Sequence, residues 1–240
     1  MEFVRIRRIL STARRAIDDY KMIEDGDRIA VGLSGGKDSL TLLCALIDLK
    51  RFYPVNYEIV GITVNMGFEG SDFSSLRNFC AKNGIEFVEK ETQLANLIFN
   101  ERKESNPCSL CARMRRGILH DACIEANCNK LALGHHYDDV INTFMLNLVH
   151  EGRIGTFSPV TYLSRKNITM IRPLIYSPEK DIRYFINHNP DLPLIASLCP
   201  EDKHTEREEI NELVISLDKK YKGFKHRAFG AIQKSHIDGY

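Results

Sequence analysis

The sequence predicts an α/β protein built on a doubly wound parallel sheet and followed by an α-helical C-terminal tail. Short apolar segments alternate with segments of helical periodicity between residues 28 and 172. Strands and helices that alternate in this way build parallel sheets with helices on both faces. From residue 177 onward helical segments continue but strands are no longer evident, so we expect a helical tail packed on the sheet over 177–240.

The size and composition of the chain suit one globular domain. Its 240 residues are 43% hydrophobic and 27% charged, with a net charge of +1. Because the chain is not basic overall, any contact with nucleic acid has to come from local clusters. The arginine-rich first ten residues do not form a signal peptide, and no segment has the roughly 20 apolar residues of a membrane helix. We therefore expect a cytoplasmic protein without membrane contact.

A basic helix is predicted at the N-terminus, over residues 1–24. Apolar side chains recur at helical spacing between residues 4 and 20. The opposite face carries Arg5, Arg7, Arg8, Arg14 and Arg15, and we interpret it as an RNA-binding surface. A solvated helix face is the alternative. A second basic cluster near the C-terminus interleaves with aromatic residues: Lys219, Lys220, Tyr221, Lys222, Phe224, Lys225, Arg227 and Phe229.

The sheet is predicted to occupy residues 25–176. Its strands are expected at 28–33, 58–65, 85–91, 130–134 and 168–172, and its helices at 40–50, 73–83 and 137–149. The tail helices are expected at 178–187, 204–220 and 224–234. Ligands of such sheets lie beyond the carboxyl ends of the strands, where Ser34, Asn65 and Gly134 are found. We therefore expect a binding site at this edge.

The segment from Ser34 to Ser39, here called the glycine loop, follows the first predicted strand and opens a helix. It reads Ser34-Gly35-Gly36-Lys37-Asp38-Ser39. Adjacent glycines let backbone N–H groups converge on one point, and the helix N-terminus adds partial positive charge, so a phosphate fits there. Asp38 could hold Mg²⁺ against the phosphates. The loop is not a Walker A motif, because only three residues separate Gly32 and Gly36 and an aspartate follows Lys37.

A second motif ends the fourth predicted strand and runs from Gly134 to Asp139. It contains Gly134, His135, Asp138 and Asp139, and we expect the two aspartates to belong to the site. The two aspartates also open a helix, where carboxylates cap backbone N–H groups, so capping is the alternative for each of them.

The seven cysteines divide into two groups. Cys108 and Cys111 form a C-x-x-C, and Cys199 lies in a loop beside Pro200. Cys44, Cys80, Cys123 and Cys128 lie in predicted helices and are expected to be small buried hydrophobic residues. In a reducing compartment the first group indicates metal or redox chemistry rather than disulfides. A lone C-x-x-C could be redox-active or bind zinc, whereas three thiolates without a fourth would suit an iron–sulfur cluster with one open iron.

The motifs together resemble those of the tRNA 2-thiocytidine synthetase family, a group of PP-loop ATP pyrophosphatases. The segment from Cys108 to Gly117 matches the family's C-x-x-C-x-R-x-R-R-G signature. Further matches run nearly end to end: the glycine loop, Leu133 to His136 with Asp138 and Asp139, Ile171 to Leu174, Glu179 to Ile182, and Leu194 to Cys199. Two positions depart from the usual pattern, Tyr137 in place of arginine and Ala196 in place of cysteine.

The resemblance implies a fold, cofactors and a reaction. The fold is the PP-loop sheet, which assigns 25–176 to an ATP-binding domain with the C-x-x-C segment as an insert. The cofactors are MgATP and a 4Fe-4S cluster on Cys108, Cys111 and Cys199. The reaction adenylates the C2 carbonyl of a cytidine in the tRNA anticodon loop and delivers sulfur there. The expected partners are tRNA and a sulfur donor, either a cysteine desulfurase or free sulfide, and a homodimer is one assembly that the sequence leaves open.

Residue roles follow from this reading. Lys37, Asp38, Asp138 and Arg116 are the expected catalytic residues, with Arg116 stabilising the adenylate or the leaving AMP. In the family a segment similar to Gly134–Asp139 faces the nucleotide. The expected nucleotide site therefore comprises Ser34, Gly35, Gly36, Lys37, Asp38, Ser39, Asn65, Gly134, His135 and Asp139. The alternative activities are tRNA 2-thiouridine synthesis and that of another PP-loop tRNA-modifying ligase, such as lysidine synthetase. A third alternative is a nucleotide-binding module braced by zinc.

Overall fold

The computed structural model describes residues 3–102, 107–200 and 206–240 and confirms the mostly parallel sheet. The six strands lie in the order β3-β2-β1-β4-β6-β5. Neighbours are parallel except for the last pair, β5 and β6, which is antiparallel. The strand bounds are β1 Asp27–Gly32, β2 Tyr57–Asn65, β3 Glu86–Glu91, β4 Lys130–Ala132, β5 Val160–Leu163 and β6 Ile168–Ile171.

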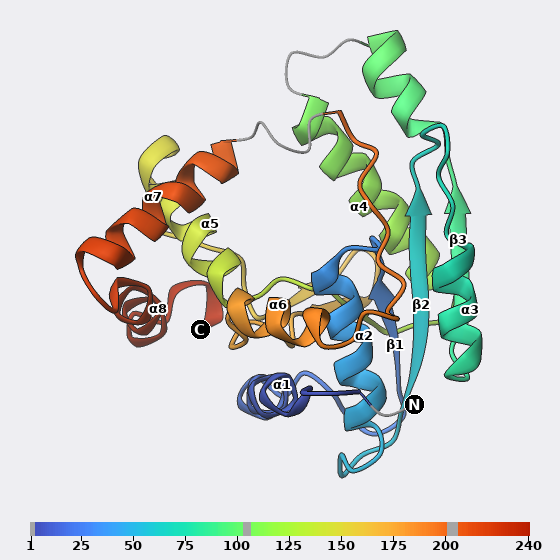
Figure 1. Cartoon of the computed structure of the whole chain (residues 1–240), viewed down its shortest axis with the longest axis horizontal. Coiled ribbons are helices and arrows are strands. Elements are labelled where there is room, and N and C mark those ends of the chain that lie inside the picture. The colour runs from blue at the N-terminus through green and yellow to red at the C-terminus, as the bar shows by residue number, and fades with distance from the viewer. Residues whose placement is uncertain (1–2, 103–106, 201–205) are drawn as a thin grey trace.

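Helices cover both faces of the sheet (Figure 1). Those before the tail are α1 Arg7–Asp19, α2 Lys37–Leu49, α3 Ser74–Lys82, α4 Pro107–Glu125 and α5 Tyr137–His150, with a π-helix at Asn96–Arg102. The tail contains α6 Glu179–Asn187, α7 Glu206–Lys220, α8 Phe224–Lys234 and a short 3₁₀ turn at Ile237–Gly239. None of the helices in the described ranges is long and apolar enough to cross a membrane.

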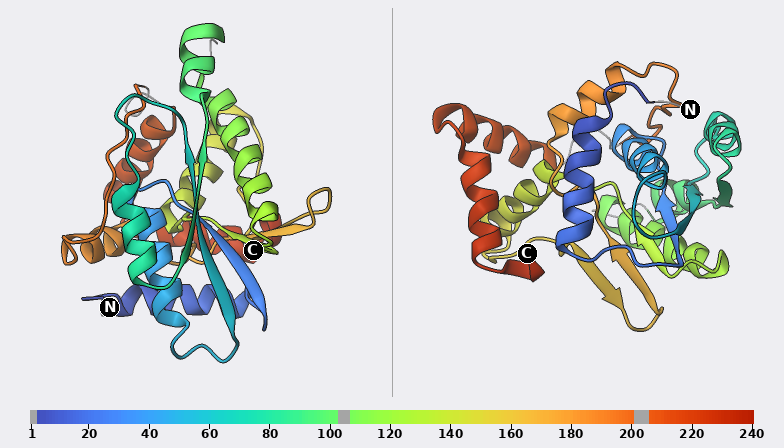
Figure 2. Two further views of the ribbon diagram at one scale, coloured as in Figure 1. Left: turned by 90° about the vertical axis from the view of Figure 1, so that its right-hand side faces the viewer. Right: turned by 90° about the horizontal axis from the view of Figure 1, so that it is seen from below.

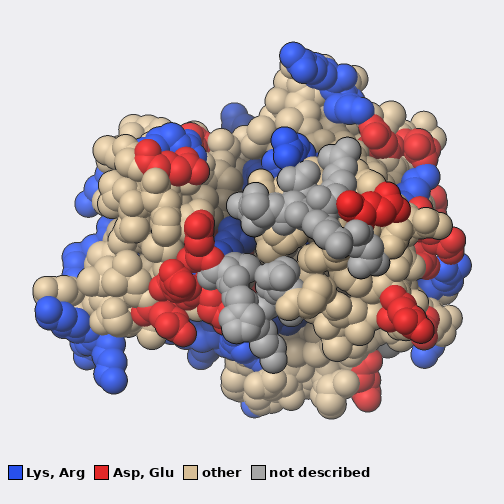
Figure 3. All heavy atoms as spheres, turned by 90° about the horizontal axis from the view of Figure 1, so that it is seen from above, with Lys and Arg blue, Asp and Glu red and all other residues tan. Residues whose placement is uncertain are grey.

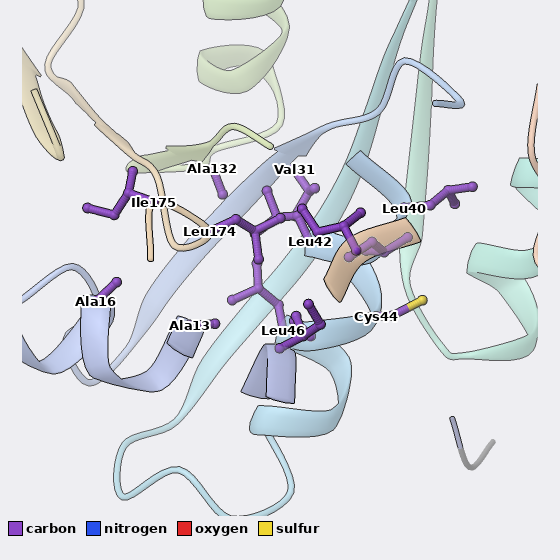
Figure 4. Close-up of a cluster of buried hydrophobic side chains, with 14 of the residues drawn as sticks. Ala13, Ala16, Val31, Leu40, Leu42, Cys44, Leu46, Ala132, Leu174 and Ile175 are labelled. Carbon is purple, nitrogen blue, oxygen red and sulfur yellow. The ribbon is translucent and has the colours of Figure 1, made fainter. Parts of the chain in front are cut away.

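The core is divided by the sheet because successive strand side chains point to opposite faces. On β1, Ile29 and Val31 join the cluster beneath α1 and α2, whereas Ala30 joins the cluster beneath α4. Figure 4 shows the first cluster, in which Leu42 and Leu46 of α2 meet Val31 and Leu174. Both faces of the central strands are therefore dry, which explains their continuous apolar sequence.

The tail does not lie on the sheet as expected. Helices α7 and α8 pack mainly against α5 (Figure 1), and the ring of Phe229 lies 4.6 Å from that of Tyr137. Buried Ile210, Val214 and Ile232 nevertheless belong to the same core as α1 and α2. The tail therefore extends the one core.

Strand β5 was not predicted. Its four residues form a hairpin with β6 at the edge of the sheet (Figure 2), and Tyr162 is exposed. So short an edge strand has no long apolar pattern, because only one side of it is paired and covered.

Candidate active site

The glycine loop lies between β1 and α2 and is held by its own two serines. The Ser34 N–H donates to Ser39 Oγ at 3.3 Å, and the Gly36 N–H donates to Ser34 Oγ at 3.3 Å. Ser39 Oγ donates to the Gly36 carbonyl at 3.0 Å. Gly35 has a φ of +79°, which an L side chain rarely adopts. The loop is thus preorganised at the N-terminus of α2, where an anion is favoured.

Lys37, in the first turn of α2, is held by two carboxylates. Its Nζ lies 2.8 Å from Asp38 Oδ2 and 3.1 Å from Glu179 Oε1 at the start of α6. Burial opposes the charged form, but the bonds to Asp38 and Glu179 outweigh it, so the pKa of Lys37 is raised. The side chain is therefore a charged ammonium beside the loop, with carboxylate partners that a phosphate can replace.

The second motif touches the glycine loop directly. A Cβ on Gly134 would lie 3.0 Å from the backbone of Asp38 and Ser39, so only glycine allows β4 to approach α2 this closely. His136 Nε2 lies 3.7 Å from Asp38 Oδ1 and 3.5 Å from Asp139 Oδ2. The carboxylates of Asp38 and Asp139 therefore flank one imidazole nitrogen beside the loop. Two such oxygens, with phosphate oxygens and water, match what Mg²⁺ uses in nucleotide sites.

Asp138 is buried, and both of its carboxylate oxygens bind the protein. Oδ2 accepts a hydrogen bond from the Glu179 N–H at 2.8 Å and thereby caps α6. Oδ1 accepts one from Lys225 Nζ of α8 at 2.6 Å. Burial raises the pKa of Asp138, but these two bonds outweigh it and lower the pKa overall. The contacts favour a positioning role, in which Asp138 fixes Glu179 and, through it, Lys37.

Lys225→Met is expected to destabilise the protein by about 3 kcal/mol at neutral pH, because it leaves a buried carboxylate without its cation. Since the pKa of Asp138 is lower in the folded state, its carboxylate stabilises the fold above its ordinary pKa, and this contribution is lost as the pH falls. The difference between variant and parent should therefore shrink only as the pH falls below about 4. Denaturant melts at about pH 7 and about pH 3 test this, with the exposed Lys222→Met as control; a pH-independent difference would contradict it.

The three candidate ligand cysteines come from two segments that the fold brings together. Cys108 and Cys111 lie in the first turns of α4, and Cys199 follows α6 in a segment that rises past α2 towards the start of α4 (Figure 1). Burial raises the pKa of the Cys111 thiol; Arg115 opposes this, and Cys199 and Cys108 add to it. The thiols of Cys108 and Cys199 are thus close enough to act electrostatically on Cys111.

The three candidate ligand cysteines are accessible from the surface. All three cysteines are exposed or half-buried. Within the described ranges no three Cys, His, Asp or Glu side chains lie close enough to hold one metal ion. Three thiolate donors are the ligand type and number that an iron–sulfur cluster with one open iron uses. The other four cysteines are buried as expected, although Cys128 lies in the loop before β4 and not in a helix.

One backbone contact joins the cysteine segment to the glycine loop. The Ile195 N–H donates to the Gly35 carbonyl at 3.0 Å. A Cβ on Gly35 would lie only 2.6 Å from Cβ of Ile195. The segment that carries Cys199 is therefore seated on the loop that is expected to bind phosphate.

Gly35→Ala is expected to disturb both functions at once, weakening ATP binding and the retention of the cluster. The added methyl group collides with Ile195 and also strains a positive φ. Gly26→Ala is a matched control, since Gly26 has a φ of +79° with nothing within 4 Å of the new methyl group. Calorimetric ATP titration and the iron content of each variant give the comparison. Equal losses of ATP affinity and iron in the two variants would show that backbone strain alone, and not the contact with Ile195, explains the effect.

Two predicted site residues lie around this centre. Asn65 ends β2, where its side chain donates to Glu89 and accepts from the Gly67 N–H, so it shapes the turn after the strand. Arg116 is exposed on α4, two turns after Cys108, and its charge helps to lower the pKa of Arg172. Figure 3 shows a hollow on this side of the molecule, with Lys or Arg side chains at its floor.

Several side chains of the expected RNA-binding surfaces already contact other protein groups. On α1, Arg8 pairs with Asp181, Arg14 with Asp18, and Arg15 lies over Tyr176. Near the C-terminus, Phe229 is buried and cannot stack on a base, and Lys225 is bound to Asp138. Tyr221 remains exposed, with Lys220 over its ring.

Sequence reasoning missed three residues that organise the site: Glu179, Ile195 and Lys225. Glu179 and Ile195 lie in segments that carry the resemblance, and Lys225 was grouped with the RNA-binding cluster. Their roles depend on contacts between residues 41 to 160 positions apart, so no local pattern marks them.

Comparisons with known proteins agree with this geometry. A family model described as the PP-loop domain matches residues 8–193. The tRNA-cytidine(32) 2-sulfurtransferase of Geotalea uraniireducens is 40% identical, over 88% of this chain and 85% of its own. The protein of the same name from Syntrophotalea carbinolica is 37% identical, over 96% and 91%. The chain belongs to the tRNA-cytidine(32) 2-sulfurtransferase family, as its motifs had indicated.

Solved structures place this family member beside another tRNA thiolase. The U34-tRNA thiolase NcsA from Methanococcus maripaludis, with its [4Fe-4S] cluster, superimposes with a TM-score of 0.77 and 27% identity, over 98% of this chain and 81% of that one. The NH₃-dependent NAD synthetase from Campylobacter jejuni has a TM-score of 0.51 and 16% identity, which shows a common fold alone. It covers 100% of this chain and 97% of that one.

Proposed function

We propose that this protein is an ATP-dependent tRNA sulfurtransferase that converts a cytidine of the anticodon loop into 2-thiocytidine. The observation that carries the proposal is the contact of Ile195 with Gly35, which seats the Cys199 segment on the glycine loop. Carbonyl activation needs a phosphate cradle, and thiolation needs a sulfur source beside it. The contact brings the two segments that we propose for these roles to one edge of the sheet.

In the proposed reaction the glycine loop binds the ATP phosphates with its backbone N–H groups and with Ser34 and Ser39. Lys37 leaves Glu179 for the phosphates and stabilises the departing pyrophosphate. Asp38 and Asp139 would hold Mg²⁺, which when bound would neutralise charge on the phosphates. Arg116, on the helix of Cys108, stabilises the charge of the adenylate, and Asp138 keeps α6 and Glu179 in position. Attack of the C2 oxygen on the α-phosphorus forms the adenylate, and AMP leaves when sulfur replaces that oxygen.

Cys108, Cys111 and Cys199 would hold the 4Fe-4S cluster, which when bound supplies the site from which sulfur is delivered. The target base has to leave its stack, because its C2 carbonyl is otherwise inaccessible. A cysteine desulfurase or free sulfide would renew the sulfur. We place the reaction in the cytoplasm, where a reducing milieu preserves free thiols, and a homodimer is compatible with it.

The direct experiment is nucleoside analysis of tRNA after incubation with reconstituted enzyme, MgATP and sulfide. The expected product is 2-thiocytidine, with one pyrophosphate released for each base modified. Pyrophosphate release without any thiolated nucleoside would contradict the proposal.

A second candidate product is 2-thiouridine, because the thiolase NcsA, whose title names U34 of tRNA, shares the fold at 27% identity. The same assay separates the two, since the modified nucleosides differ in mass. The relatives named as cytidine enzymes are more similar and favour cytidine.

A further inference from the structure

Arg172, directly after β6, is a buried cation with neutral partners. The residue is 6% exposed. Its Nε donates to His135 Nδ1 at 3.3 Å, and its Nη1 donates to the Ser158 carbonyl at 2.5 Å and to Thr161 Oγ1 at 3.3 Å. The guanidinium also lies over the ring of Phe157, 5.0 Å from its centre. The side chain is thus fixed on three sides, and Nη2 makes no hydrogen bond to a described residue.

The charge of Arg172 lacks a counter-ion. No Asp or Glu in the described ranges forms an ion pair with it, and burial lowers its pKa to about 10, with Tyr240 opposing and Arg116 adding to the effect. The phenol of Tyr240 supplies no negative charge at neutral pH, because burial raises its pKa far above the ordinary value. A desolvated cation without an anion is costly, so its retention in a fixed pose indicates a ligand that supplies the anion.

His135 extends the same site with a second donor. Burial, with the charge of Arg172, lowers its pKa to about 4, so the ring is neutral at physiological pH. Because Nδ1 accepts the bond from Arg172, the proton of the neutral ring lies on Nε2. The ring is held 4.8 Å from that of Phe157. Its Nε2–H is therefore an oriented donor with no hydrogen-bond partner among the described residues.

The position of this pair points to RNA rather than ATP. Arg172 and the glycine loop lie on opposite sides of β4, since the strand order is β1-β4-β6. The loop already supplies the donors that ATP phosphates need. The charge of Arg116, on the cysteine-bearing helix α4, adds positive potential at Arg172. At His135 the charge of Arg207 on α7 adds positive potential, and the charge of Asp139 opposes it. Positive potential of this kind favours a polyanionic substrate such as RNA.

We propose that Arg172 and the Nε2–H of His135 bind one phosphodiester group of the substrate tRNA, next to the nucleotide that is modified. This inference rests on the proposed function. Arginine suits phosphate because its planar fork presents parallel donors, and phosphate contacts fix the register of a nucleic acid on its protein. Arg172 is thus a substrate-positioning residue, one strand away from the site of adenylation.

The test is the salt dependence of tRNA binding by Arg172→Gln, Arg172→Lys and the parent cluster-loaded protein. Loss of one phosphate contact lowers the slope of log Kd against log salt by about 1. We expect this in Arg172→Gln, with weaker tRNA binding at low salt and an unchanged Kd for ATP. Arg172→Lys should recover the slope but not all of the affinity, which a merely structural role would not produce. Arg51→Gln, an exposed arginine at the far end of α2, is the control and should keep the parent slope.

Arg116→Gln tests the site independently, because this exposed side chain is not needed for folding, and its slope should fall as well. It decides the matter if the Arg172 variants do not fold. An unchanged slope in a folded variant overturns the proposal. So does a loss of ATP affinity with unchanged tRNA binding, which would assign the anion to the nucleotide. If the parent protein binds tRNA and the variants show the expected slopes, but no thiolated base is formed, the proposed function is refuted and the phosphate site is retained. If the parent protein does not bind tRNA, both proposals are refuted.

Discussion

Alanine in place of Cys199 is expected to give a folded protein that binds MgATP but does not retain an iron–sulfur cluster. Only two thiols would then remain, on one helix, and two ligands cannot hold a cluster that three anchor. Iron in the anaerobically purified protein should fall from about four atoms per chain to near zero, together with its brown colour. Cys108→Ala and Cys111→Ala should behave in the same way.

Cys123→Ala is the matched control for these variants. Cys123 lies on the same helix, α4, but is fully buried and its thiol contacts backbone carbonyls of the core. Its replacement should keep the colour, the iron and the sulfide. A colourless parent protein with one tightly bound zinc ion would refute the cluster assignment. It would instead favour a nucleotide-binding module whose structure is stabilised by zinc.

Lys37→Ala is expected to lower the rate of pyrophosphate release by about 10²- to 10³-fold, the usual loss when one preorganised charge at the reacting group is removed. The side chain stands beside the glycine loop, where Asp38 and Glu179 hold its ammonium group. Asp38→Ala should also block adenylation, since it removes one of the two carboxylates that flank His136.

The spectrum of the cluster should be unchanged in both variants, because the glycine loop and the cysteines serve different steps. Lys50→Ala is the control: this exposed lysine lies directly after α2, at the end remote from the loop, and its loss should leave the rate unchanged. If Lys37→Ala still forms 2-thiocytidine at the parent rate, the assignment of the glycine loop is wrong.

Local sequence patterns were sufficient for most of the fold. The continuous apolar segments of β1 and β2 predict buried parallel strands, because both faces of such strands are dry. The two glycines after β1 predict a phosphate loop, because close backbone approach and a positive φ both require glycine. Strand β5 and the packing of α7 and α8 on α5 escaped prediction, since an edge strand and a helix-on-helix contact leave weak or ambiguous periodicity.

The sequence by itself determined the class of fold, the glycine loop and the set of three cysteines outside the core, and its motifs already indicated the family. Only the tertiary structure decided how these parts meet: Ile195 seated on Gly35, Glu179 on Lys37, Lys225 on Asp138, and Arg172 buried without a counter-ion. The physical reason is the separation in sequence between the residues that make these contacts. Strand and turn patterns reflect interactions between residues that are close in the sequence. Ion pairs and packing contacts between distant segments form only once the folded core holds those segments in place.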